Sequence, residues 1–204
     1  PSLVGSEMCI RDSYSLSGYE GDDVLGTLSA RYEKELPVAI VTGDRDALQL
    51  ASDRTTVYLT QKGISSMSEM TPKAVEEKYG ITPSQVIDMK ALMGDTADNI
   101  PGVPGIGEKT ALKLLTQYKT LDNLYAHVDE IKGAQGKKLA AGKDMAYLSY
   151  KLAAIKSDVP METTLEEMAQ PVHISEMKEL FSRLGINLLS QFGELPRFTA
   201  LAEA

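Results

Sequence analysis

Apolar and polar residues follow one another in the first half of the chain in a pattern typical of an α/β sheet. Val24, Leu28 and Tyr32 recur at four-residue spacing, which predicts an amphipathic helix with acidic residues in its first turn. The continuous apolar run 38–41 comes after it, and such short runs are typical of buried parallel strands. A helical pattern at residues 47–51 comes next. Helix, buried strand and helix in this order predict an α/β sheet.

The later elements are predicted from strand composition and from helix-start signals. Residues 55–60 have strand composition, and the chain is compatible with a returning strand from Ile64 onward. Thr71 and Thr82 each place a capping hydroxyl directly before a proline, a combination that marks the first turn of a helix. From Ala111 to the end the pattern predicts mostly helices. The sequence therefore predicts an α/β part followed by an all-helical part.

These patterns divide the chain into four regions. We expect an α/β part at residues 14–94, a helical part at 95–190 and a tail or linker at 191–204. Residues 1–13 lack a starting Met, a signal-peptide pattern and any periodicity that continues into the first predicted helix. We interpret them as a non-native tail derived from a translated sequencing adapter, the alternative being a genuine disordered arm.

Composition and charge narrow the function. The chain has 204 residues and a formal net charge of -8, which argues against nucleic-acid binding by its overall field. Any nucleic-acid contact must therefore be local. Cys9 is the only cysteine, and His127 and His173 are far apart in sequence, so we expect neither a disulfide framework nor a zinc cluster. No apolar run is long enough to span a bilayer, and a reducing cytoplasm fits best.

Seven carboxylates stand out because they form three close groups, each at the end of a predicted element. They are Glu20, Asp22 and Asp23, then Asp44 and Asp46, and then Asp95 and Asp98. Carboxylates gathered without a cation repel one another, which raises some pKa values and costs stability. Mg²⁺ or Mn²⁺ would relieve this repulsion, because hard divalent ions take oxygen ligands and bridge to phosphates.

Each acidic group also has an ordinary structural explanation. Acidic residues are favoured in the first turn of a helix and in tight turns. Helical geometry places Glu20 and Asp23 on one face and directs Asp22 away from it. Asp95 and Asp98 share a face only if the backbone between them is helical. Spacing alone leaves the metal-binding and structural interpretations both open.

A glycine- and proline-rich segment at residues 101–107 has the composition of a tight hairpin between two helices. Free amides in such a loop can hold a phosphate, or a monovalent cation that touches one. The candidate DNA-binding residues are Gly102, Val103, Gly105, Ile106, Gly107, Lys109, Thr110 and Lys113. The alternative is a plain helix–helix connector.

Three motifs, at residues 19–28, 42–46 and 94–111, are similar in sequence and order to those of the 5'-3' exonuclease domain of bacterial DNA polymerase I, in the flap endonuclease family. The resemblance extends from Tyr19 to Phe181. It implies a partial α/β nuclease part (resolvase-like, with a PIN-like fold) followed by helices with a helix-hairpin-helix. Gly21 stands where we expect an alanine, a change of little consequence.

The resemblance also implies a metal-dependent hydrolase that cleaves DNA at 5' ends and flaps during replication and repair. By position, Glu20, Asp22 and Asp23 would belong to a first Mg²⁺ or Mn²⁺ site. Asp44, Asp46, Asp95 and Asp98 would belong to a second. The hairpin would grip duplex DNA, with a K⁺ ion, and the substrates would include flaps and RNA primers. We expect a monomer, fused to a polymerase in the full-length protein, that works at the bacterial nucleoid without membrane contact.

The chain lacks a family segment that comes before the first motif. That segment holds a strand with further Asp ligands and a basic arch. We therefore expect little nuclease activity from this chain, and an α/β part in which a sheet edge and the inner faces of Val24 and Leu28 are exposed. Two alternatives stay open. One is a non-catalytic, structure-dependent duplex-binding module, and the other is a PIN-type RNase, which the hairpin disfavours.

Overall fold

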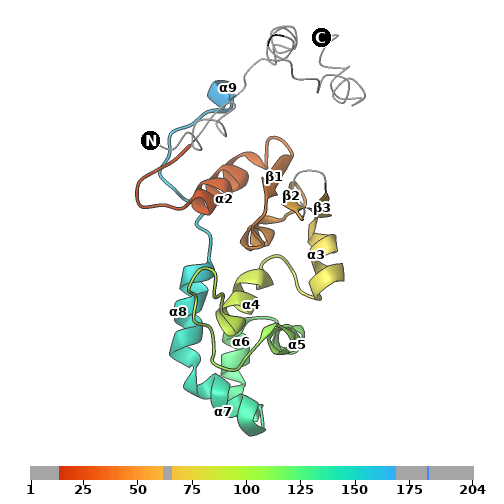
Figure 1. Ribbon diagram of the computed structural model, residues 1–204, viewed down its shortest axis with the longest axis vertical. Helices are drawn as coiled ribbons and strands as arrows, with labels where there is room; N and C mark the ends of the chain where they lie inside the picture. The colour runs from red at the N-terminus through yellow and green to blue at the C-terminus, as the bar shows by residue number, and fades with distance from the viewer. Residues whose placement is uncertain (1–13, 62–65, 169–182, 184–204) are drawn as a thin grey trace. The chain divides into compact units, whose positions relative to one another are not determined.

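The computed structural model describes residues 14–61, 66–168 and 183 (Figure 1). The described residues up to Pro160 belong to one compact unit, and those from Met161 onward belong to another. The predicted non-native tail at 1–13, His173 and the predicted tail at 191–204 lie outside the described residues. No helix in the described part is both long and apolar enough to cross a membrane.

The first helix, α2 (Gly21–Tyr32), confirms the predicted amphipathic segment. The carboxylate of Asp23 accepts a hydrogen bond of 3.2 Å from the backbone N–H of Glu20, which satisfies an amide that the helix itself leaves unpaired. Val24 is buried, so the expectation that it is exposed is wrong. This helix packs against η1 and β1, and the segment after α8 returns to it, where the Val159 amide donates to Thr27 Oγ1 at 3.0 Å.

The described strands form a three-stranded mixed sheet in the order β1-β2-β3. The parallel pair is β1 (Val38–Thr42) with β2 (Thr55–Thr60), in a register that sets Ile40 opposite Val57. The returning strand, β3 (Met67–Met70), is confirmed and runs antiparallel to β2.

The apolar run of β1 is not buried on both faces, contrary to the prediction. Ile40 is only 3% exposed, whereas Val41 is 58% exposed. Among the described strands, β1 lies at the edge of the sheet, so only one of its faces packs against the core. The short 3-10 helix η1 (Asp46–Leu50) comes after it and packs Ala47 and Leu48 into the core.

Two helices connect the sheet to the rest of the unit. The first, α3 (Pro72–Tyr79), starts as predicted, because Thr71 Oγ1 accepts from the Ala74 amide at 3.2 Å. The second, α4 (Gln85–Met93), begins later than predicted. The hydroxyl of Thr82 bonds to the side chains of Ser84 and Gln85 and caps no backbone amide. Pro83 and Ser84 form a turn before the helix, which displaces its start.

The remainder of the compact unit is helical, as predicted. Its elements are α5 (Glu108–Tyr118), α6 (Leu121–Ala126), η2 (Val128–Glu130), α7 (Gly133–Ala141) and α8 (Lys143–Ala153). Helix α4 packs against α5 and α8 and also contacts η1, so a single helix carries side chains toward both the sheet and the helical part. In the second unit, α9 (Leu165–Met168) begins with reciprocal hydrogen bonds between Thr164 and Glu167.

Candidate active site

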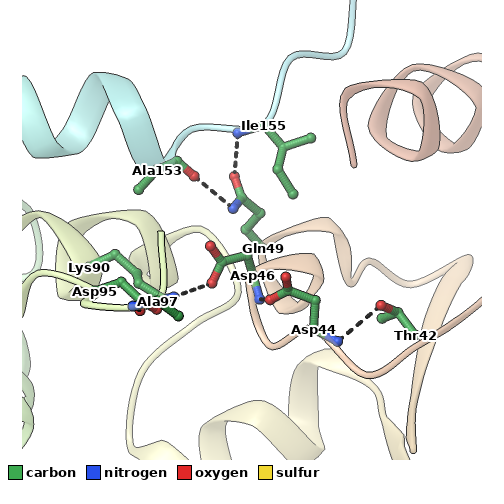
Figure 2. A network of polar contacts seen from close by, with 9 residues as sticks. All are labelled: Thr42, Asp44, Asp46, Gln49, Lys90, Asp95, Ala97, Ala153 and Ile155. Atoms are coloured by element: carbon green, nitrogen blue, oxygen red, sulfur yellow. Dashed lines mark hydrogen bonds and ion pairs between the residues drawn. The ribbon is translucent and has the colours of Figure 1, made fainter. Parts of the chain in front are cut away.

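Asp44 and Asp46 lie directly after β1, at the carboxyl end of the strand. The Asp44 amide donates to Thr42 Oγ1 at 3.0 Å, and the Asp46 amide donates to Asp44 Oδ1 at 2.9 Å (Figure 2). These side-chain-to-backbone bonds turn the chain from the strand into η1. Asp44 stays exposed at the turn, while Asp46 is only 9% exposed. The turn thus presents one carboxylate to solvent and buries the next.

Lys90 of α4 is the charge partner of this turn. It is only 6% exposed, its ammonium lies 2.5 Å from Asp46 Oδ1, and it also forms an ion pair with Asp95 Oδ2. Figure 2 shows the lysine between the two acidic segments. Burial opposes the charged form, but the bonds to Asp46 and Asp95 outweigh it and raise the pKa of Lys90 above its ordinary value.

Lys90 is not among the site residues that the sequence predicts. It belongs to none of the acidic groups and sits in a helix among apolar residues, where a lysine is unremarkable. One signal was present: Lys90 is five residues before Asp95, in a helix whose neighbouring positions are mostly apolar. A lysine that cannot reach solvent needs a carboxylate beside it.

Asp95 and Asp98 lie on a turn and not on a helix, so the condition under which they share a helical face is not met. Asp95 and Ile100 form an isolated antiparallel bridge, and Asn99 between them has a positive φ of 57°. Asp95 Oδ1 accepts from the Ala97 amide at 2.8 Å. The hydrogen bond from Lys90 lowers the pKa of Asp95 below its ordinary value. Asp95 therefore stays ionised beside the lysine.

The residues of the first acidic group have different partners. Asp23 binds backbone on both sides, because its Oδ1 accepts from the Lys156 amide at 2.9 Å while its Oδ2 accepts from Glu20. Asp22 points toward the other carboxylates. Burial raises the pKa of Asp22, and the charges of Asp44 and Asp46 raise it further.

Asp46 lies near carboxylates from all three acidic groups. It lines a cavity of 240 Å³ together with Glu20, Asp22 and Asp23. Burial raises the pKa of Asp46, and the charges of Asp44 and Asp98 add to this effect, while Lys90 offsets part of it. Asp46 therefore interacts electrostatically with Asp22, Asp44 and Asp98, and Lys90 connects it to Asp95.

The described part of the chain contains no group of three or more His, Cys, Asp or Glu side chains placed to hold a metal ion. Two contacts account for this arrangement. The ammonium of Lys90 occupies the space between Asp46 and Asp95, and Asp23 is engaged by backbone amides. A cation that used these carboxylates would have to compete with, or sit beside, the lysine.

The segment after α8 supports this site from one side. Gln49 of η1 donates to the Ala153 carbonyl at 3.1 Å and accepts from the Ile155 amide at 3.0 Å (Figure 2). The same segment supplies the Lys156 amide to Asp23. Residues more than a hundred positions apart in sequence thus fix the orientation of η1 and of the first turn of α2.

The hairpin is held by backbone packing. Gly102 has a φ of 61°, and a Cβ there would overlap the backbone nitrogen of Gly94. The Gly102 amide donates to Ser149 Oγ at 2.9 Å, and the Val103 amide donates to the Leu92 carbonyl at 2.8 Å. These contacts attach the loop to α4 and α8, so the glycine is required by close approach as well as by its φ.

The loop offers fewer free amides than the sequence suggests. Gly102, Val103 and Ile106 all donate within the protein, so the expectation of unpaired amides is wrong for these three. Val103 and Ile106 also bury their side chains in the core. Gly105 and Gly107 donate no hydrogen bond within the described residues.

Basic side chains surround the exposed part of the loop. Lys109 and Lys113 are exposed on α5, next to Thr110. A Cβ at Gly105 would lie 2.5 Å from Lys138 Nζ, so α7 brings a third ammonium to the loop. Local positive charge therefore exists on a chain whose net charge is negative.

Two family models match consecutive parts of the chain. The 5'-3' exonuclease N-terminal resolvase-like domain matches residues 7–80, and the 5'-3' exonuclease C-terminal SAM fold matches residues 81–176. The first match begins inside the segment 1–13, and the models meet before Gly94, where the sequence analysis places its boundary.

Curated relatives and solved structures agree with these matches. DNA polymerase I of Bacillus caldotenax is 50% identical over 187 residues, and that of Bacillus subtilis is 47% identical over 185 residues. These alignments cover 90% and 89% of this chain but only 21% of each relative, so the chain spans about a fifth of their length.

Two solved structures share the fold. One is the bacteriophage T5 5'-exonuclease with bound zinc, with a TM-score of 0.61 and 23% identity, covering 72% of this chain and 55% of that one. The other is the T5 flap endonuclease in a complex with DNA and metal ions, with a TM-score of 0.64 and 19% identity, covering 98% of this chain and 66% of that one. Together with the three motifs, the family models show that this chain belongs to the 5'-3' exonuclease family.

Proposed function

We propose that this chain carries the carboxylate site and the duplex-binding hairpin of a metal-dependent 5'-3' exonuclease and flap endonuclease. In the full-length protein this activity would remove RNA primers and flaps during DNA replication and repair. The observation that carries the proposal is the clustering around Asp46, where four other predicted carboxylates interact and Asp22 and Asp46 have raised pKa values. Carboxylates that are partly buried and also repel one another favour a divalent cation.

The donor set fits Mg²⁺ or Mn²⁺, because it consists of carboxylate oxygens without histidine or cysteine. In our assignment Glu20, Asp22 and Asp23 serve the first ion, and Asp44, Asp46, Asp95 and Asp98 serve the second. Such ions would activate water and neutralise the scissile phosphate. The two backbone amides bound by Asp23 would also position the start of α2 beside the first ion.

Lys90 has a defined task in this scheme. Its ammonium holds Asp46 and Asp95 together across two segments that are distant in sequence. It therefore keeps the carboxylates gathered before any cation binds, and it offsets part of their negative charge when a phosphate approaches. The same contact competes with a metal ion for Asp46. The affinity for metal therefore depends on how far the gathering of the carboxylates by Lys90 outweighs this competition.

The hairpin would bind the backbone of duplex DNA through Gly105, Gly107, Lys109, Lys113 and Lys138, with a K⁺ ion that touches a phosphate. The relatives are DNA polymerases, and the solved T5 neighbour is bound to DNA. We infer a monomer fused to a polymerase that works at the bacterial nucleoid. A duplex-binding module without catalysis is the second candidate, because no three described ligands converge.

Flap cleavage decides between these functions. The 204-residue chain should be tested alone and fused behind the corresponding upstream segment of Bacillus subtilis DNA polymerase I. We expect metal-dependent cutting by the fusion, little by the chain alone, and loss of cutting in the fusion with Asp46→Ala. Calorimetry with Mg²⁺ and Mn²⁺ on the fusion and on its Asp46→Ala variant provides a second readout. Equal metal binding by both, or a fusion that binds flaps without cutting them, would favour the binding module.

A further inference from the structure

A cavity of 410 Å³ lies beside the acidic site and has two different surfaces. Its rim is charged and consists of Arg45 and four carboxylates, Asp44, Asp95, Asp98 and Glu108. Its wall is apolar and consists of Leu48, Tyr79, Ile81, Val86, Met89 and Met93. The volume falls within the range of small-molecule sites, about 300 to 1,000 Å³. The carboxylate chemistry uses only the rim, so the apolar wall has no role in the mechanism described above.

Tyr79 gives this wall a polar position. Its hydroxyl oxygen is buried and has no hydrogen-bond partner within the described part of the chain. The Lys78 ammonium lies 5.4 Å from the centre of its ring. Buried hydroxyls are almost always paired, in proteins or with water or ligand. An apolar wall with one unpaired hydroxyl suits a flat ring that has apolar faces and a hydrogen-bonding edge.

The charged groups at the opening indicate which substituent the bound ring carries. Arg45 is exposed at the opening, and guanidinium groups recognise phosphate by paired hydrogen bonds. Lys90 lies deeper in the lining and is paired with Asp46 and Asp95, so Arg45 is the cation that faces solvent there. The neighbouring carboxylates favour a phosphate whose charge is bridged by a cation. A nucleotide matches this arrangement, because its base would face the apolar wall, its sugar would lie at the opening, and its phosphate would lie at the charged rim.

We propose that this cavity binds one nucleobase of the DNA substrate, next to the phosphate that is cleaved. The base would pack against Tyr79, Met89 and Met93, the Tyr79 hydroxyl would bond to its edge, and Arg45 would contact its phosphate. Methionine sulfur packs favourably against aromatic rings. This inference rests on the proposed function for its substrate, but base binding can be measured without cleavage.

The test uses the 204-residue chain in Ca²⁺, a divalent cation that can bridge the phosphate to the carboxylates, with flap and single-stranded oligonucleotides that carry 2-aminopurine at successive positions near the 5' end. We expect quenching at one position only. Removing the base at that position should weaken binding about tenfold, the loss typical of one stacked base. Tyr79→Phe removes only the hydroxyl and should weaken binding of the intact base while leaving abasic DNA unaffected.

Two variants serve as controls for this test. Tyr58→Phe makes the same change on β2, outside the cavity, and should behave like the wild type. Ala97→Trp places a large side chain at the exposed rim and should abolish the position-specific quenching, whereas Ala97→Ser should not. The Ala97 pair keeps the proposal testable if Tyr79→Phe alters folding.

The outcomes separate this inference from the proposed function. DNA binding that is equally strong with and without the base overturns the nucleobase site, whatever the cleavage assay gives. Position-specific quenching that Ala97→Trp abolishes supports the site. If that quenching occurs while the upstream fusion fails to cut flaps, the nucleobase site stands and the proposed nuclease function falls.

Discussion

The acidic site and the glycine hairpin both attach to α4, but different forces hold them in place. At the acidic site, Lys90 keeps Asp46 and Asp95 together by charge. At the hairpin, the Leu92 carbonyl accepts from the Val103 amide, and Gly102 packs against the backbone at Gly94. One site depends on a side chain from a distant segment, and the other depends on backbone contacts that only glycine permits. Substitutions in α4 and in the loop should therefore affect the free energy of unfolding and its pH dependence differently.

The largest effect is expected at Lys90. Lys90→Met keeps the length of the side chain but leaves the buried Asp46 without its cation. Removing one partner of a buried ion pair typically costs about 3 to 5 kcal/mol. We expect a loss of this order in the free energy of unfolding, measured with urea at pH 7.

The pH dependence gives this prediction its control. The lysine lowers the pKa of Asp95, so Asp95 contributes stability above its unfolded pKa that is lost as the pH falls through the lower folded value. This acid-side loss should shrink in Lys90→Met. The exposed lysine in Lys73→Met should change neither quantity. A Lys90→Met protein as stable as the wild type would show that the ion pairs are incidental.

A somewhat smaller effect is expected at Gly102. Gly102→Ala adds a Cβ into the backbone of α4 and forces a left-handed φ, which together should cost about 3 kcal/mol. Gly107→Ala is the matched control, because its Cβ would meet nothing within 4 Å and its φ is ordinary. Urea unfolding checks both variants. Equal losses in the two would mean that the close approach to Gly94 is not what fixes the loop.

The contrast between the two sites also explains what the sequence could predict. The hairpin was predictable from composition, because glycine itself permits the positive φ and the close backbone approach found at Gly102. Asp44 and Asp46 were predictable because they come directly after a strand.

Tertiary neighbours decided the rest. Nothing near Lys90 in sequence shows that Asp46 lies beside it, and the bridge between Asp95 and Ile100 replaces the helix that three-residue spacing suggested. The exposure of Val41 depends on which strand lies next to β1, and the burial of Val24 accompanies the return of the chain after α8. Local patterns contain none of this information.

Asp88 on α4 is a useful contrast to Asp46, because it is a buried carboxylate that is not paired with a lysine in the described part of the chain. It accepts from the Leu121 amide at 3.0 Å, and burial raises its pKa from 3.8 to about 6. Because the folded protein holds this proton more tightly than the unfolded chain, Asp88 favours folding most below pH 3.8. That contribution is lost as the pH rises to about 6.

Asp88→Asn keeps the acceptor for the Leu121 amide and removes the charge. Above pH 6 it should stabilise the protein by about 1 to 2 kcal/mol, less than the full linkage value because the surroundings relax. Asp129→Asn makes the same change at an exposed position in η2 and should leave the pH profile unchanged. Urea unfolding from pH 4 to pH 8 checks this. A destabilised Asp88→Asn at pH 7 would contradict the raised pKa.

The smallest effect is expected at Lys138, whose ammonium lies beside Gly105 on the open side of the hairpin. It is exposed, so Lys138→Ala should leave stability unchanged and act only on DNA. If this ammonium contacts one phosphate, its loss should reduce the slope of log affinity against log salt by about 0.9 and weaken duplex binding similarly for all sequences. Fluorescence anisotropy with a labelled duplex in EDTA, across a salt series, measures both quantities. Lys73→Ala, an exposed lysine on α3, removes the same charge from another surface and should keep the wild-type slope. Identical slopes for wild type and Lys138→Ala would confine the contact surface to α5 and leave α7 outside it, because one released counterion per neutralised phosphate is the minimum that a real contact produces.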